Sequence, residues 1–367
     1  MKQDNVFYVG VDVSKAKHAI AIAEAGREGE VRYFGEIEAT EASVERFVRK
    51  LEQKYPRLHF CYEAGPTGYG LYRQIVALGQ RCDVVAPSLI PKRAGERVKT
   101  NRRDAVSLAR LLRAGELTGI WVPDIVHEAV RDLARVRAAA SEDLRKKRQM
   151  LLSFLLRHGR VFSGHKHWSR AHARWLAAQK FDHPAQQIVF QDQVDVITDA
   201  QARLERLDAQ LVPSWSMVPV VAAYQALRGV SFIVAVTFVS EVGDVRRFDN
   251  PRQLMAFLGL VPSERSTGET VKRGGLTLAG NRRARRVLVE GAWSYRYPAR
   301  VSEPIRVRLE GLPKAVREIA WKAQTRLCTR YRRMTAAGKK KPIVVAAIAR
   351  QMAAFLWAIG HQVEPVR

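Results

Sequence analysis

The first 115 residues alternate apolar segments of strand length with amphipathic segments of helix length, and this order constrains the fold more than any other feature of the chain. Residues 6–13, 18–24 and 31–38 are rich in Val, Ile, Tyr and Phe and are separated by polar or Gly-containing turns, which predicts an antiparallel meander. An amphipathic helix over 41–55 follows. Alternating strands and helices complete the segment, namely the strands 59–64 and 82–87 and the helices 68–79 and 102–115. The sequence therefore predicts a mixed sheet with helices packed on it.

Three carboxylates stand out in this segment because the chain as a whole is basic, with 62 Lys and Arg against 36 Asp and Glu and a formal net charge of +26. Asp12 and Glu63 lie where the first and fourth strands end, and Asp104 lies near the start of a helix. Carboxylates beside the strands of a basic protein are typical of one that binds nucleic acid and holds a metal ion against it. Each acid also has a structural alternative, since Asp favours turns and an acid favours the first turn of a helix.

The positive charge is concentrated in the C-terminal part, where residues 267–341 hold twenty Lys and Arg against five acids. This density predicts a surface that contacts nucleic-acid phosphates, and a solvated basic surface is the alternative. The candidates for phosphate contacts are Lys272, Arg273, Arg282, Arg283 and Arg286.

Cysteine usage and apolar segment length indicate the compartment. The three cysteines are widely spaced and form neither a disulfide framework nor a zinc pattern, which indicates a reducing environment. The N-terminus lacks the features of a signal peptide, and the longest apolar stretches are far shorter than the roughly 20 residues of a membrane span. We expect a soluble, cytoplasmic protein without membrane contact.

Two helical segments without Pro or Gly, 126–158 and 194–212, dominate the middle of the chain. They predict an antiparallel coiled-coil arm used in oligomerisation, and simple packing within the chain is the alternative. The stretch between them is rich in histidine but matches no common zinc signature, so a basic, aromatic surface is preferred there. Further on, two short helices are predicted around Gly229 and Gly243.

At the level of motifs, GVDVSK, YEAGPTGYG and KTNRRDA, followed by LMAFLGLVPSERSTGETVKRGGLTLAGNRRARRVLVEGAW, resemble the insertion-sequence transposases that pair a RuvC-like DEDD domain with a serine-containing transposase domain. The resemblance covers nearly the whole chain. It implies an α/β plus all-α protein with an RNase H-like domain over 1–120, a helical coiled-coil linker domain over 121–215 and a mostly helical serine transposase domain over 216–367. The helices around Gly229 and Gly243 resemble the family's helix-hairpin-helix-like element.

The acidic set carries over onto this sequence with one departure. Asp12, Glu63 and Asp104 match acids that bind Mg²⁺ in the family, whereas the third acid position is Asn101. Asn keeps a carbonyl oxygen for a metal but removes one negative charge. Alternatively, Asn101 is a helix cap, and the basic residues around it contact phosphate. These residues are Lys99, Arg102 and Arg103.

The family's nucleophilic serine lies just before a glycine, and this chain has Ser266, Thr267 and Gly268 there. Alignment from Pro262 places Thr267 in the nucleophile's column, whereas chemistry favours Ser266, because a primary hydroxyl is less hindered in an attack on phosphorus. A Gly-rich loop whose hydroxyls only satisfy its backbone is the alternative.

The resemblance implies a DNA transposase that cuts and rejoins donor and target DNA through a phosphoserine intermediate. It also implies a non-coding bridge RNA as guide, and a homodimer or homotetramer. The sequence is also compatible with two other functions. One is a metal-dependent RuvC-like nuclease or junction resolvase that uses water, and the other is a catalytically inactive nucleic-acid-binding protein, which the Asn at position 101 hints at.

Overall fold

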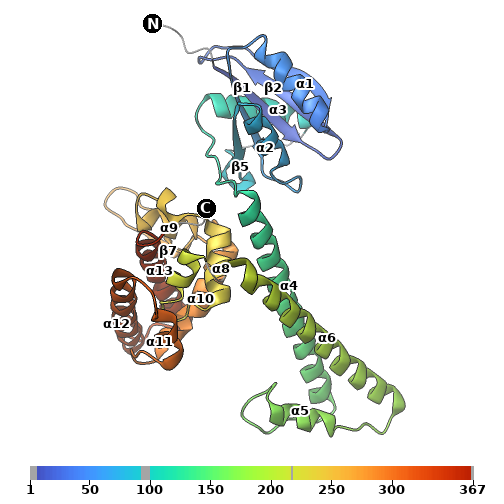
Figure 1. Ribbon diagram of the computed structural model, residues 1–367, viewed down its shortest axis with the longest axis vertical. Helices are drawn as coiled ribbons and strands as arrows, with labels where there is room; N and C mark the ends of the chain where they lie inside the picture. The colour runs from blue at the N-terminus through green and yellow to red at the C-terminus, as the bar shows by residue number, and fades with distance from the viewer. Residues whose placement is uncertain (1–5, 92–99, 216–217, 365–367) are drawn as a thin grey trace. The chain divides into compact units, whose positions relative to one another are not determined.

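A five-stranded mixed sheet builds the N-terminal unit of the chain, residues 1–122, and helices build nearly all of the second unit, residues 123–367 (Figure 1). The computed structural model describes residues 6–91, 100–215 and 218–364. The predicted mixed sheet and helical remainder are confirmed. Each unit has its own apolar core.

The first strand occupies the centre of the sheet, whose order is β3-β2-β1-β4-β5. The strands are β1 Val6–Val13, β2 Lys17–Ala23, β3 Val31–Glu38, β4 Arg57–Glu63 and β5 Arg81–Val85. The first three pair antiparallel, whereas β4 runs parallel to both β1 and β5. This order is consistent with an RNase H-like domain.

The two faces of this sheet carry side chains of different size because alternate residues point to opposite faces. Val9, Val11, Ile20 and Ile22 form one apolar core with Phe47 and the rest of the inner faces of α1 (Glu41–Glu52) and α2 (Gly70–Ala77). The opposite face carries small residues, chiefly Gly and Ala, and packs against α3 (Asn101–Arg113) through Ala105 and Ala109. The helix α3 therefore approaches the sheet more closely than a large side chain would allow.

Gly10 is the point of closest approach, and substitution there is expected to destabilise the N-terminal unit. A Cβ added at Gly10 would overlap the Ala105 carbonyl oxygen and the Ala109 amide nitrogen. We expect Gly10→Ala to lower the free energy of unfolding by about 1–3 kcal/mol, measured by urea denaturation, because the helix must shift outward. Gly70→Ala is the matched control, since an added Cβ at Gly70 meets nothing within 4 Å. Equal midpoints for Gly10→Ala and the unchanged protein would contradict this packing.

The middle of the chain forms an antiparallel helical pair, α4 (Ile125–Arg157) and α6 (Pro184–Trp215), and the short helix α5 (Arg170–Ala177) lies in the connection at the far end of the pair (Figure 1). Arg137 on α4 pairs with Asp208 on α6 at 2.7 Å, and Arg148 donates to Gln201 at 2.6 Å, so the two helices run in opposite directions. The second helix begins ten residues before the predicted 194, because Pro184 is accommodated in the first turn of a helix.

The C-terminal part is a helical bundle with one small hairpin. Its elements are α7 Pro219–Tyr224, α8 Phe232–Val242, α9 Pro251–Phe257, β6 Pro262–Glu264, β7 Arg273–Leu276, α10 Arg282–Ala292, α11 Glu303–Leu309, α12 Lys314–Ala336 and α13 Lys341–Gly360. Short 3₁₀ turns lie at Val245–Arg247 and Trp293–Arg296 in this part, and at Pro87–Leu89 in the N-terminal unit.

The last helix forms the centre of this bundle. Val344, Ile348, Met352 and Leu356 are completely buried on one side of α13. Within the described ranges, α13 alone is long and apolar enough to cross a membrane by length and composition, and half of its most apolar stretch is buried in the fold. Its apolar character therefore has a structural explanation in the core of the bundle.

Candidate active site

Asp12 and Glu63 lie at the same end of the adjacent strands β1 and β4, and on the same face of the sheet. The parallel register of β1 and β4 pairs Gly10 with Cys61 and Val11 with Tyr62, so the next positions along are those of the two acids. Gly10 meets α3, and the Cys61 thiol donates a weak hydrogen bond to the Leu108 carbonyl oxygen of α3 at 3.6 Å. Because the side-chain period of a strand is two, both acids belong to the face that α3 covers.

Asp104 lies in the first turn of α3, immediately before the residue that contacts Gly10. The pKa of the Tyr33 hydroxyl reports the surroundings of this turn. Partial burial raises that pKa, the negative charges of Glu36 and Asp12 raise it further, and Arg102 opposes them. The Arg102 guanidinium lies 5.3 Å from the centre of the Tyr33 ring. Tyr33 thus lies within electrostatic range of both Asp12 and the first turn of α3.

Asn101 is the first residue of α3 and not its cap, so the alternative role as a helix cap is wrong. Thr100 caps the helix instead, since it has extended backbone angles and its hydroxyl accepts a hydrogen bond from the Arg103 amide at 3.3 Å. Asn101 and Asp104 are three residues apart and thus neighbours on the helix surface. The Asn101 carbonyl oxygen is therefore placed on the same side of α3 as the Asp104 carboxylate.

The donor chemistry of this edge suits a hard divalent cation. Three carboxylates and one amide supply only oxygen atoms, which Mg²⁺ and similar ions prefer. In the described ranges, no group of three or more His, Cys, Asp or Glu side chains is arranged so that it could hold a metal ion. The register of β1 and β4 and the packing of α3 thus bring the backbones of these residues to one end of the sheet, but their side chains do not form a metal-binding cluster in this structure.

A basic hollow of about 700 Å³ flanks the same helix. Its lining includes Tyr33, Arg102, Arg103, Arg110 and Arg113. Of the predicted phosphate-contacting residues in this unit, Arg102 and Arg103 are exposed in the first turn of α3, and Lys99 lies outside the described residues.

The serine hairpin, which we define as residues 262–276, presents the candidate nucleophile on an exposed turn. The Ser266 hydroxyl donates to the Glu264 carboxylate at 2.8 Å, and Arg273 donates to the other carboxylate oxygen at 3.4 Å. These two hydrogen bonds lower the pKa of Glu264, so its carboxylate is ionised at neutral pH. Ser266 is thus the hydroxyl of this turn that has a carboxylate acceptor.

Thr267 lies one position further, where the chain reverses. The Thr267 and Thr270 amides each donate to the other residue's carbonyl oxygen at 3.1 Å, and Gly268 between them has a φ of +57°. That backbone conformation favours glycine. Thr267 therefore shapes the turn through its backbone.

The base of the serine hairpin is tightly packed, in contrast to its exposed tip. A Cβ added at Gly259 would overlap the Ala279 carbonyl oxygen, and one at Gly280 would overlap that of Phe257. The Asn281 amide donates to the Phe257 carbonyl oxygen at 3.0 Å. These contacts tie the hairpin to the end of α9 and the start of α10.

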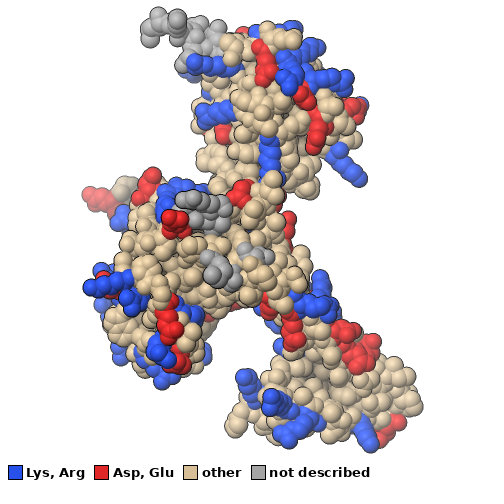
Figure 2. Space-filling view, viewed as in Figure 1, with Lys and Arg blue, Asp and Glu red and all other residues tan. Residues whose placement is uncertain are grey.

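The predicted basic residues of this part lie on the hairpin and on α10. Lys272 and Arg273 lie on the returning side of the hairpin, and Arg282, Arg283 and Arg286 are exposed in the first turns of α10. Positive charge does not form one unbroken patch on the face drawn in Figure 2. Over α11 and the start of α12 it is interspersed with acidic side chains in the pairs Arg306–Glu303 and Lys314–Glu318.

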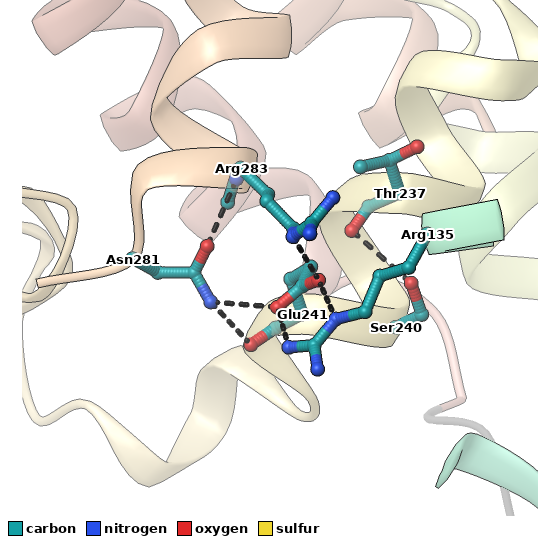
Figure 3. A network of polar contacts seen from close by, with 7 residues as sticks. Arg135, Thr237, Ser240, Glu241, Asn281 and Arg283 are labelled. Atoms are coloured by element: carbon teal, nitrogen blue, oxygen red, sulfur yellow. Dashed lines mark hydrogen bonds and ion pairs between the residues drawn. The ribbon is translucent and has the colours of Figure 1, made fainter. Parts of the chain in front are cut away.

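A buried carboxylate that sequence reasoning missed lies next to these basic residues. The Glu241 side chain on α8 is 3% exposed and accepts hydrogen bonds from Arg135 and Asn281 (Figure 3). The sequence carried a signal, because Glu241 is a charged residue in the otherwise apolar helix FIVAVTFVSEV. Charged residues are almost never buried unless they are paired.

Comparisons with known proteins agree with this architecture. Residues 9–159 match the DEDD transposase domain of the IS110 type, and residues 222–303 match the Transposase IS116/IS110/IS902 family. The chain is 57% identical over 355 residues to y4qE of Sinorhizobium fredii (strain NGR234), which is named as a transposase, with 97% of this chain and 88% of that protein covered. This chain belongs to the IS110/IS116 transposase family. It is also 33% identical over 346 residues to the transposase for insertion sequence element IS1533 of Leptospira borgpetersenii, covering 91% of this chain and 98% of that one.

Membership of this family defines the class of reaction that the protein catalyses. The protein is a DNA transposase of a mobile element and acts on a DNA substrate. A DEDD domain of this type implies dependence on a divalent metal, in agreement with the oxygen donors at the edge of the sheet. The resemblance drawn from the motifs is confirmed at the level of the family.

Proposed function

We propose that this transposase cuts and rejoins DNA through a phosphoserine intermediate at Ser266. The observation that supports it best is the Ser266 hydroxyl itself, which is exposed on a hairpin with a packed base and donates to a carboxylate at 2.8 Å. A nucleophile needs access to its substrate and an acceptor for its proton. Thr267 is the second candidate for the nucleophile.

In the proposed reaction the Ser266 oxygen attacks a DNA phosphorus atom and gives its proton to the Glu264 carboxylate, which accepts its hydrogen bond. A phosphoserine diester forms, the bond from phosphorus to one strand oxygen breaks, and that strand leaves as a free hydroxyl after taking up a proton. Because the linkage replaces one phosphodiester by another, attack by a strand hydroxyl reverses it without an external energy source.

Mg²⁺ is the proposed metal, with Asp12, Glu63 and Asp104 as carboxylate ligands and the Asn101 carbonyl oxygen as a neutral fourth. When bound, such an ion supplies charge stabilisation for the attacking and leaving oxygens of a phosphoryl transfer. The protein's contribution is the placement of the donors at one sheet edge, which the close packing of α3 on β1 supports.

The proposed nucleic-acid contacts are made by the exposed basic residues near the two groups of site residues, together with Lys99. They are Lys99, Arg102, Arg103, Lys272, Arg273, Arg282, Arg283 and Arg286. Helices α7 and α8, with Gly229 between them, are proposed to act as the helix-hairpin-helix-like element. We further propose a homodimer or homotetramer that uses the arm of residues 121–215, an active form in the cytoplasm, and a bridge RNA that selects donor and target DNA by base pairing.

A discrete RNA is expected to co-purify with the transposase if base pairing selects the DNA sites. Sequencing of the bound RNA is expected to show one structured species encoded beside the transposase gene, because a guide must carry the two target-specific segments. Ribonuclease treatment is then expected to abolish site-specific recombination, which the purified RNA restores. Bulk cellular RNA without a dominant species would instead indicate a generic basic binder.

A further inference from the structure

A buried polar network joins three helices of the second unit at Glu241 (Figure 3). Arg135 on α4 donates to both carboxylate oxygens of Glu241, at 2.7 Å and 2.9 Å. Asn281, at the start of α10, donates its side-chain amide to the carboxylate at 2.9 Å and to the Glu241 carbonyl oxygen at 3.3 Å. Arg283 approaches the same carboxylate at 3.9 Å. One side chain of α8 therefore receives donors from α4 and from α10.

The carboxylate is ionised despite its burial. Burial raises the pKa of Glu241, but the hydrogen bonds from Arg135 and Asn281 and the nearby guanidinium groups outweigh it, so the pKa is lowered. Bidentate pairs between Arg and a carboxylate fix the relative orientation of their partners more narrowly than apolar contacts do. The network therefore restricts how α4, α8 and α10 can turn against one another.

Asn281 connects this network to the serine hairpin. Its side-chain oxygen caps α10 by accepting from the Ala284 amide at 3.0 Å, and its backbone amide donates to Phe257 at the hairpin base. At the hairpin base itself, the Thr277 amide donates to the Val261 carbonyl oxygen at 2.9 Å. The path from Glu241 to the hairpin base thus consists of one residue that is hydrogen-bonded on both sides.

A role in stability alone does not explain a charged network at this place. Helices α8 and α10 already pack through buried apolar residues of the same core, such as Val239 and Leu288. Replacing a buried ion pair by apolar residues of similar volume is often neutral or stabilising. A hollow of about 310 Å³ also lies beside the network and is lined by Arg135, Thr237 and Arg283. The side chains around Glu241 therefore do not pack as closely as those of the apolar core.

We infer that Glu241 is a positioning residue for the serine hairpin. Through Asn281 it holds the start of α10 and the hairpin base in one orientation toward α4, and this orientation presents Ser266 to the DNA phosphate. The inference rests on the proposed role of Ser266 as nucleophile. Residues outside the reacting groups can matter in this way because a displacement of about 1 Å at a reacting atom lowers rates by about 10²-fold.

Single-turnover formation of the covalent protein–DNA adduct tests the inference. Glu241→Gln keeps the size of the side chain and removes its charge, and at saturating DNA it is expected to lower the rate about 10²-fold. Glu290→Gln is the matched control, because Glu290 lines the same hollow but pairs at the surface with Arg286 on its own helix. An unchanged rate in Glu241→Gln would overturn the inference.

The double variant Arg135→Met with Glu241→Leu separates positioning from stability. It is expected to keep the thermal midpoint, because the ion pair is replaced by apolar side chains, and yet to stay slow in adduct formation. Recovery of the rate in this variant would overturn the positioning role.

Hydrogen exchange of the amides at Thr277 and Asn281 gives a readout that is independent of catalysis. We expect these two amides to exchange faster in Glu241→Gln than in the unchanged protein. The exchange of amides in α12 is expected to stay the same. If the unchanged protein forms no adduct while this exchange responds, the proposed nucleophile fails and the positioning of the hairpin stands. If adduct forms but exchange at the hairpin base does not respond, the positioning inference fails.

Discussion

Ser266→Ala is expected to abolish the covalent protein–DNA adduct, with a fall of at least about 10³-fold in its rate of formation. The reason is that the substitution removes the oxygen that attacks the phosphorus atom in the proposed reaction. The measurement is denaturing electrophoresis of the transposase after incubation with labelled DNA and Mg²⁺. DNA affinity is expected to stay the same, because the substitution removes one uncharged hydroxyl.

Two neighbouring hydroxyls provide the comparison. Ser263→Ala is expected to keep the adduct, since the Ser263 hydroxyl donates to the Gly275 carbonyl oxygen at 3.1 Å within the hairpin. Thr267→Ala is also expected to keep it, because Thr267 shapes the turn through its backbone. Loss of the adduct in Thr267→Ala together with its retention in Ser266→Ala would make Thr267 the nucleophile.

Asp12→Asn is expected to lower metal-dependent strand cleavage by at least about 10³-fold. The substitution preserves the shape of the side chain but removes one negative charge from a donor set in which Asn101 already lacks one, so a divalent cation is held less strongly. Strand cleavage of a DNA substrate with Mg²⁺ is the measurement, and chelation with EDTA is expected to reproduce the loss in the unchanged protein.

The control for this substitution is Glu45→Gln on α1. Glu45 is a surface carboxylate that pairs with Arg49 of its own helix at 2.7 Å, so its replacement is expected to leave cleavage unchanged. Cleavage that persists in Asp12→Asn would make the acids structural. Metal-dependent cleavage without any adduct would identify a nuclease that uses water, and binding without cleavage would identify a nucleic-acid-binding protein.

Local patterns in the sequence predicted most of the elements but not all of their limits. The helix at α3 was expected because its apolar residues recur at helical spacing, yet the capping residue is Thr100, one position before Asn101. Thr and Asn both favour the cap, and only the backbone angles decide between them. The start of α6 was missed because its first turn, residues 184–187, carries Pro and Gln and no large apolar residue.

Some residues of the candidate site could be predicted from short sequence motifs, whereas others depend on contacts between distant parts of the chain. Asp12, Glu63 and Ser266 were expected from motifs, because each motif is a short stretch whose residues are close in the sequence. Glu241 was not expected, because its partner Arg135 is 106 residues away and the two meet only when α4 packs against α8. Contacts of that separation leave no periodic signal in either helix.

The sequence by itself determined the family, the order of strands and helices, and the residue types of the acidic edge and the serine turn, since these depend on short motifs and on hydrophobic periodicity. Only the tertiary structure decided that Asp12 and Glu63 share one face, through the register of β1 and β4 and the close contact of α3 at Gly10. It alone decided that Glu241 is buried and paired. Register and burial arise from packing between distant segments, and local sequence does not encode which segments meet.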